Sequence, residues 1–156
     1  MNTKTHIRLA TQDDVESLTL LRELMLLELN EGAIEPERLS ELRELSNDWL
    51  RVALSDGRAA GWIAEMDGEM VGGASITIIS TQPQFRSPEV RVASIYGVYV
   101  KPEHRGQGIA TAVVKTAVDY AREIGIVLAT LHAAEKARAI YERIGFEPST
   151  EMRLFL

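Results

Sequence analysis

The feature that most constrains the fold is a glycine-bearing turn, Arg105-Gly106-Gln107-Gly108-Ile109-Ala110, between an apolar strand at Val98 to Val100 and an amphipathic helix. Apolar residues recur at helical spacing after the turn, and Gly125 predicts a left-handed cap that ends this helix. A helix that begins in this way exposes backbone N–H groups without intrahelical partners, and its dipole adds partial positive charge there. The turn therefore predicts an α/β unit with an anion site, most often for phosphate, at the start of the helix.

The turn does not match the familiar nucleotide-binding loops. It has no Gly-Lys-Ser/Thr, which excludes a P-loop, and it lacks the third glycine of the dinucleotide fingerprint. Taken alone, a Gly-x-Gly turn before a helix can also serve only to reverse the chain. The residues that follow must decide between these two interpretations.

Those residues continue the α/β pattern. They predict a strand from Ile126 to Leu131, a helix whose apolar face includes Ile140 and Ile144, and a stop at Gly145, after which Phe146 opens another strand. The helix carries Tyr141-Glu-Arg-Ile-Gly145-Phe146 at its end. The order of strand, Arg105-Gly-Gln-Gly108-Ile-Ala110 turn, helix, strand and this second motif resembles the GNAT superfamily of N-acetyltransferases.

Two short motifs carry the resemblance, within the stretch from Arg91 to Phe146. The family's Arg/Gln-x-x-Gly-x-Gly/Ala motif, at the start of its central helix, is matched by Arg105, Gly108 and Ala110. The Tyr-x-x-x-Gly-Phe motif found in many members is matched by Tyr141, Gly145 and Phe146.

The resemblance implies binding of acetyl-CoA, or another acyl-CoA, as cosubstrate, with its pyrophosphate at Gln107 to Ala110. The cofactor-binding residues that it implies are Val98, Tyr99, Val100, Arg105, Gly106, Gln107, Gly108, Ile109, Ala110 and Tyr141. Ala134 stands where many members carry an Asn, seven residues before the tyrosine. This departure removes one polar cofactor contact, and its effect stays open.

Gly97 interrupts the strand that leads to the turn, and a glycine inside a strand often marks a bulge. The resemblance implies a bulge that separates the strand ending at Val100 from the strand ending at His132. The backbone of Val98 and Val100 would then pair with the pantetheine amides. The Val98 N–H would face the acetyl oxygen as an oxyanion donor.

Tyr141 is the predicted general acid, because a phenol with a pKa of about 10 is protonated at neutral pH and can donate to a departing thiolate. A core tyrosine is the competing interpretation. His132 is the predicted general base, because histidine is the residue type best suited to proton transfer near neutral pH, with Tyr96, Glu28 and a water chain as rivals. Glu28, Glu31 and Tyr96 are the predicted substrate-binding residues, and each can instead be an ordinary surface residue.

The first half of the chain supplies the remaining elements. The sequence predicts a strand at His6 to Leu9, a helix capped by Thr11 to Asp14, and a second helix that begins at Pro36. A hairpin follows, with strands from Ala60 to Met66 and from Glu69 to Ile79 around Asp67-Gly68. Further elements expected are a loop from Ser80 to Val90 and strands at Arg91 to Val100 and Met152 to Leu156.

Together these elements predict an α/β fold in one domain spanning residues 1–156. We expect a GNAT-like, mixed and largely antiparallel sheet of about seven strands, flanked by helices and split between the strands that end at Val100 and His132.

The composition restricts the classes of ligand and partner that the chain can bind. The 156 residues include no Cys, which excludes disulfides and thiolate zinc sites. The three His residues are scattered along the sequence and do not have the spacing of a metal-binding motif. The net charge of −6 argues against general nucleic-acid binding and is compatible with a cationic amine. Since the sequence shows neither a membrane-spanning run nor a signal-peptide core, we expect a cytoplasmic protein without a membrane partner. A homodimer stays open.

The predicted activity is transfer of an acetyl group from acetyl-CoA to a primary amine of a small molecule or peptide. A non-catalytic acyl-CoA-binding regulatory module is the first alternative, and an interaction protein with a purely structural turn is the second. The acceptor amine, the acyl-chain preference and the oligomeric state stay open.

Overall fold

The computed structural model describes residues 4–86 and 89–156. In that part of the chain five strands form one sheet in the order β1-β2-β3-β4-β5. They are β1 (His6–Leu9), β2 (Ala59–Met66), β3 (Glu69–Ser80), β4 (Arg91–Val100) and β5 (Ala129–Leu131). The first four are antiparallel neighbours, whereas β5 runs parallel to β4. That parallel pair requires a crossover, which α3 (Ile109–Glu123) provides.

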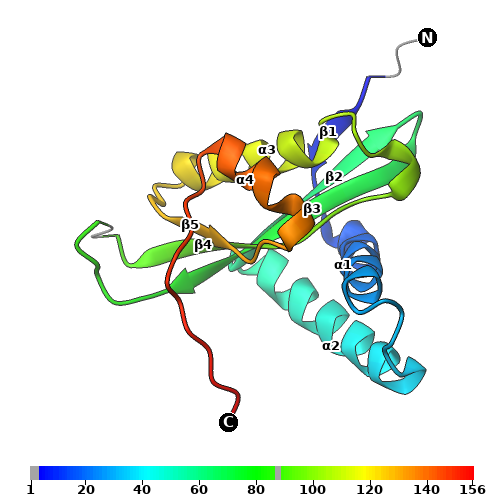
Figure 1. Ribbon diagram of the computed structural model, residues 1–156, viewed down its shortest axis with the longest axis horizontal. Helices are drawn as coiled ribbons and strands as arrows, with labels where there is room; N and C mark the ends of the chain where they lie inside the picture. The colour runs from blue at the N-terminus through cyan, green and yellow to red at the C-terminus, as the bar shows by residue number, and fades with distance from the viewer. Residues whose placement is uncertain (1–3, 87–88) are drawn as a thin grey trace.

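The helices cover both faces of the sheet (Figure 1). α1 (Val15–Leu29) and α2 (Pro36–Ser55) lie on one face, while α3 and α4 (Arg138–Ile144) lie on the other. β2 explains why both faces are buried: Ile63 packs with the core beneath α1 and α2, whereas Trp62 and Ala64 pack with α3. Successive strand residues point to opposite faces, so this apolar run supplies two hydrophobic cores.

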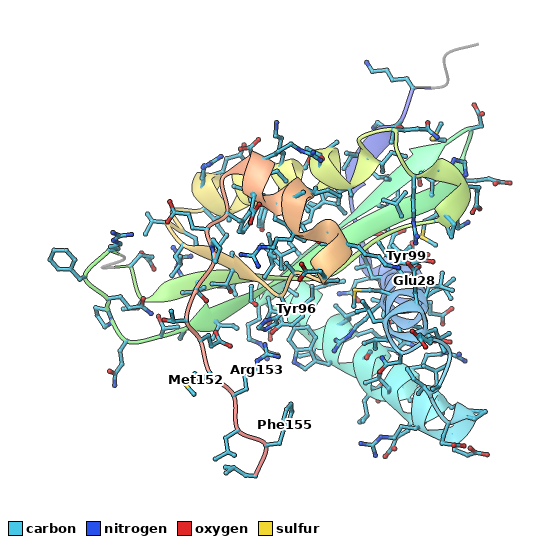
Figure 2. All side chains as sticks on the ribbon, viewed as in Figure 1. Glu28, Tyr96, Tyr99, Met152, Arg153 and Phe155 are labelled. Carbon is cyan, nitrogen blue, oxygen red and sulfur yellow. The ribbon has the colours of Figure 1, made fainter. Side chains whose placement is uncertain are left out.

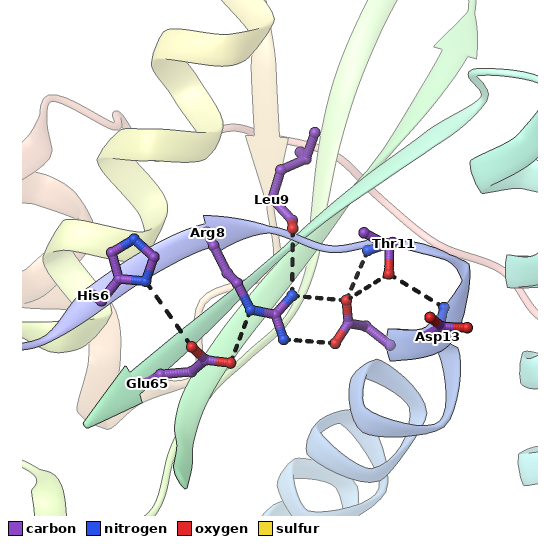
Figure 3. A network of polar contacts seen from close by, with 7 residues as sticks. His6, Arg8, Leu9, Thr11, Asp13 and Glu65 are labelled. Carbon is purple, nitrogen blue, oxygen red and sulfur yellow. Dashed lines mark hydrogen bonds and ion pairs between the residues drawn. The ribbon is translucent and has the colours of Figure 1, made fainter. Parts of the chain in front are cut away.

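A polar network fixes the first strand to the first helix turn (Figure 3). Arg8 donates two 2.8 Å hydrogen bonds to the carboxylate of Asp14 and one to Glu65 on β2. Asp14 and Thr11 also form the capping box predicted from the sequence. The Arg8 hydrogen bonds lower the pKa of Asp14 to about 2, so this buried carboxylate is ionised at neutral pH.

The hairpin prediction is confirmed, because β2 and β3 pair on either side of Asp67-Gly68 and both turn residues adopt positive φ. The helices and the strands at His6–Leu9 and Arg91–Val100 also lie where expected. Between β3 and β4, residues 87–88 of the predicted loop, including its second proline, lie outside the described residues.

The expectation of about seven strands is wrong, since the structure has five in its described part. Phe146 opens no strand, Met152 to Leu156 form none, and β5 is shortened to Ala129–Leu131. The reason is the lack of a partner. A strand exists only through hydrogen bonds to a neighbour, and the C-terminal segment, residues 147–156, lies outside the sheet with Leu154 and Phe155 82% and 91% exposed.

Candidate functional site

The sheet splits between β4 and β5. Their parallel pairing runs from Ala93 with Ala129 to Ile95 with Leu131 and then stops, although β4 continues to Val100. The last five residues of β4 therefore have a neighbour on the β3 side only. This is the split predicted from the sequence, with α3 starting just beyond one end of it.

A bulge at Gly97 decides which backbone groups face the split. Tyr96 pairs with Ser75 and Tyr99 with Gly73, so two residues of β4 oppose one residue of β3. Gly97 has φ +62°, which favours glycine, and the predicted bulge is confirmed.

Beyond the bulge, strand alternation fixes the direction of each N–H group. The Lys101 N–H donates to Val71 on the β3 side, so the alternate residues Val100 and Val98 direct theirs toward the split. On the other side of the bulge, the Ala93 N–H donates across to Leu128 beside β5. Without the extra residue, the N–H groups of the odd-numbered residues would continue to face β5, as that of Ala93 does. The Val98 N–H would then face β3 instead. The bulge thus turns the Val98 N–H toward the split.

The turn before α3 is open to a ligand. Gly106 and Gly108 adopt φ +76° and +79°, and a Cβ added at either position would have no other heavy atom within 4 Å. Gly108 is the N-cap of α3 and supplies no side-chain cap to the first N–H groups. Ile109 is buried and anchors the helix, whereas Gln107 is exposed. Geometry and charge at this turn fit an anionic group such as a pyrophosphate.

Arg105 is engaged by protein groups. Its Nε donates to the carbonyl oxygen of Val100 at 2.9 Å, and its two terminal nitrogens donate to both carboxylate oxygens of Glu28 at 3.0 and 2.6 Å. The guanidinium also lies 5.3 Å from the ring centroid of Tyr99. Figure 2 shows Glu28 and Tyr99 close together, at the end of α1 next to β4.

This pairing joins a predicted cofactor residue to a predicted substrate residue. The Arg105 hydrogen bonds lower the pKa of Glu28, so the carboxylate is a poor general base and a fixed negative charge. Burial, and after it the negative charge of Glu28, raises the pKa of Tyr99. Because 77 positions separate Arg105 from Glu28, no local sequence pattern signals their contact.

Tyr141 lies on α4, 8% exposed, in the core between the sheet and α3. Its ring packs edge-on against Phe146, with centroids 6.1 Å apart, which explains why the two motif residues occur together. Burial raises the pKa of Tyr141, so the phenol keeps its proton at neutral pH. Its oxygen makes no hydrogen bond to the described residues.

His132 follows β5 directly and is exposed. Arg153, from the C-terminal segment, lies 2.9 Å from its Nδ1. Since a guanidinium can only donate, Nδ1 must accept, and the hydrogen of the neutral ring is then on Nε2. In this arrangement neither ring nitrogen is free to take a proton from a substrate.

The other predicted substrate residues lie differently. Tyr96 is half-buried beside the bulge, with the guanidinium of Arg22 on α1 5.9 Å from its ring centroid. Glu31 is exposed beyond the end of α1, and its side chain makes no hydrogen bond or ion pair with other described residues. Ala134, which replaces the common Asn, caps a short 3₁₀ turn before α4. The structure therefore places Glu28 beside β4, the strand that carries Tyr96, whereas the side chain of Glu31 makes no hydrogen bond or ion pair with the described residues of that strand.

The described residues form neither a membrane-spanning helix nor a metal cluster. No helix in the described part is long and apolar enough to cross a membrane. No group of three His, Cys, Asp or Glu residues within residues 4–86 and 89–156 is placed to hold a metal ion. The cytoplasmic location expected from the sequence stays a prediction.

Comparison with known proteins adds independent evidence. A family model described as the acetyltransferase (GNAT) family matches residues 21–146. A solved GCN5-related N-acetyltransferase from Ralstonia eutropha JMP134 is 31% identical, with a TM-score of 0.88 over 98% of this chain and 99% of that chain. A predicted acetyltransferase from Clostridium acetobutylicum, solved with acetyl-CoA, is 27% identical, with a TM-score of 0.86 over 98% and 96% of the two chains.

Curated relatives share a shorter region. N-acetyltransferase 8 of Rattus norvegicus is 33% identical over 101 residues, which are 63% of this chain and 44% of that protein. An uncharacterized N-acetyltransferase of Escherichia coli (strain K12), YjgM, is 33% identical over 91 residues, 56% of this chain and 51% of that protein. The chain spans about half the length of these relatives.

Proposed function

The chain belongs to the GNAT family of acetyltransferases, and on that premise we propose that it transfers an acetyl group from acetyl-CoA to a primary amine of a small molecule or peptide. The observation that carries the proposal is the split in the sheet, where the pairing of β4 with β5 stops at Ile95 and Leu131. Unpaired backbone then leads along β4 toward the open turn before α3. This arrangement fits a long cofactor with an anionic end.

The backbone of this chain would hold acetyl-CoA at two places. The N–H groups of Gln107 to Ala110 would bind the pyrophosphate, since the turn is open and the helix dipole favours negative charge. Val98 and Val100 direct their N–H groups toward the split, where the pantetheine arm has amides to pair with them. The carbonyl oxygen of Val100 already accepts from Arg105, so the N–H of Val100 is the group of this residue that the ligand would bind.

The chemical step needs a hydrogen-bond donor for the oxyanion and a proton donor for the departing sulfur. The amine nitrogen attacks the thioester carbonyl, and the Val98 N–H stabilises the oxyanion. As the C–S bond breaks, its electron pair goes to sulfur, and Tyr141 donates its proton there. The raised pKa of Tyr141 supports this role, because the acid form is the one present at neutral pH.

Glu28 is the proposed contact for the acceptor before reaction. Its carboxylate is held ionised by Arg105 at the end of α1 beside β4, and the lone pairs that remain beside the two bonds to Arg105 can accept from an ammonium group. Tyr96 and Glu31 are proposed as neighbouring walls of the same acceptor site. The acceptor class is therefore an amine that arrives as a cation.

The amine must lose a proton before it attacks. His132 is the proposed base, and it can act only after Arg153 leaves Nδ1, because that contact occupies the lone pair of the neutral ring. Replacing Arg153 by Ala is then expected to preserve or raise turnover, whereas replacing His132 by Ala lowers it. If a water chain takes the proton instead, neither substitution changes turnover.

Binding and turnover test the proposal separately. Calorimetry with acetyl-CoA measures binding, and release of free thiol with a panel of cationic and neutral amines measures transfer. We expect tight acetyl-CoA binding together with thiol release that depends on a cationic amine. Binding without thiol release for any amine would support the regulatory module instead, and absence of binding would leave the turn a structural element.

A further inference from the structure

Arg22 on α1 is a half-buried cation without an anionic partner among the described residues. The other two half-buried arginines in the described part of the chain, Arg8 and Arg91, both donate to carboxylates. Arg22 makes no hydrogen bond or ion pair with a described residue, and its guanidinium lies over the ring of Tyr96, 5.9 Å from the centroid. Because withdrawing an unpaired charge from water is costly, this position indicates an anion that a ligand supplies.

The side chain of Arg22 begins beside the bulge of β4. A Cβ added at Gly97 would meet the Cβ and Cα atoms of Arg22 at 3.6 and 3.9 Å. Gly97 directly precedes Val98, whose N–H is the proposed oxyanion donor. The guanidinium of Arg22 is therefore within one side-chain length of the place where the thioester carbonyl would lie.

The two faces of the sheet differ in polarity at the closed end of the split. On one face, Ile95 is buried in the apolar core beneath α3. On the other face, the hydroxyl of Thr130 donates to that of Ser94 at 3.4 Å, and Tyr96 follows two residues later on the same side of β4. Since Arg22 of α1 lies over Tyr96, the polar face is the one toward α1 (Figure 2). A polar acceptor should approach the thioester from this side, because the apolar core fills the other.

We propose that Arg22 binds a carboxylate of the acceptor, so that the acceptor is an α-amino acid or a similar compound with a carboxylate close to its amine. This inference rests on the proposed acetyl transfer and names the acceptor class of the same site. Glu28, also on α1, would accept from the ammonium group of this acceptor. The acceptor would thus be recognised as a zwitterion, with an arginine for its carboxylate and a glutamate for its amine.

A carboxylate matches Arg22 better than a phosphate does. The planar guanidinium offers parallel donors that bind both oxygens of a carboxylate. A phosphate monoester presents three acceptor oxygens and a charge close to −2, for which a single guanidinium is a poor match.

Paired acceptors test the inference. The assay is thiol release with a panel of amino acids and their primary amides, which keep the amine and the side chain but lose the negative charge. We expect Arg22→Gln to lower the acid-to-amide ratio of kcat/KM by about 10–100-fold, as for a hydrogen bond to a charged group, mainly through a higher KM for the acid. Arg22→Lys keeps the charge without the planar fork and should give an intermediate ratio. Because the same two acceptors are compared in every variant, their different basicity cancels.

Arg122→Gln is the matched control, because it makes the same change on α3, on the other face of the sheet, at an exposed arginine that donates to Asp119. Its acid-to-amide ratio should equal that of the wild type. An equal loss for acid and amide in Arg22→Gln would show that Arg22 only packs α1 against β4, and would overturn the inference. A wild type that prefers phosphoethanolamine to every amino acid would assign Arg22 to a phosphate and overturn it as well.

The same assay separates this inference from the proposed function. Thiol release with an acid-to-amide ratio that Arg22→Gln leaves unchanged would remove only the carboxylate contact and keep acetyl transfer. Absence of thiol release from every amine would overturn acetyl transfer itself, and the acceptor class with it.

Discussion

Replacing Tyr141 by Phe separates catalysis from packing, because the change deletes one oxygen from a ring that is 8% exposed. The ring keeps its edge-on contact with Phe146, and the lost hydroxyl makes no hydrogen bond to the described residues. We therefore expect the free energy of unfolding to change by less than about 0.5 kcal/mol. Loss of the general acid should lower kcat by about 10²–10⁴-fold, which corresponds to roughly 3–5 kcal/mol in the barrier.

The assay is thiol release under conditions in which the chemical step limits the rate, with acetyl-CoA affinity measured by calorimetry alongside. Tyr120→Phe is the matched control, because Tyr120 on α3 also packs edge-on, against Trp62, and lies outside the proposed mechanism. The wild-type rate should fall on the alkaline side only above pH 10, since burial raises the pKa of Tyr141 beyond its ordinary value of 10.0. If Tyr141→Phe keeps most of its kcat, the acid is another group and Tyr141 is a core residue.

Three further changes have defined outcomes. Gly108→Val should weaken acetyl-CoA binding at least tenfold by calorimetry, whereas Gly57→Val, with the same φ of +79° and equally open space, carries the backbone strain without the loss of affinity. Asp14→Asn should lower the free energy of unfolding at pH 7 by about 2 kcal/mol in denaturant titrations. The wild type should lose the same increment as pH falls from about 4 through 2, because the pKa of Asp14 is depressed to about 2 and the carboxylate stabilises the fold only while ionised. Glu28→Gln should raise KM for a cationic acceptor and leave KM for a neutral amine unchanged, with little effect on stability because the ion pair is half exposed.

The local elements were predictable because local chemistry determines them. Asp67-Gly68 adopts the positive φ values that a two-residue hairpin turn needs, and Gly108 caps α3 in the left-handed conformation that glycine permits. The capping box of Thr11 and Asp14 is likewise a contact between near neighbours. Each of these features lies within a few residues, where spacing and residue type carry the information.

Strand number was not predictable in the same way, because a strand requires a partner that can lie anywhere. Met152 to Leu156 have the alternation of a strand, yet the described chain offers them no neighbour. The ion pair of Arg105 with Glu28 and the contact of Arg153 with His132 also join distant segments. The sequence therefore identified Glu28 and His132 as site candidates but not the cations that control what each can do.

The bulge at Gly97 depends both on a local residue type and on pairing between distant segments. Glycine at this position predicted an irregular strand. Which N–H groups the irregularity turns toward β5 depends on the hydrogen bonds that β4 makes to β3 and to Leu128, and these are visible only in the structure. One inserted residue changes the alternation, so Val98 and Val100 direct their N–H groups toward the split where Val98 would otherwise face β3. A Cβ at Gly97 would meet Arg22 only at an ordinary 3.6 Å, so the requirement for glycine here comes from φ +62° and not from space. The backbone that would hold the thioester is thus set by a conformation that glycine adopts readily, one strand residue before the donor itself.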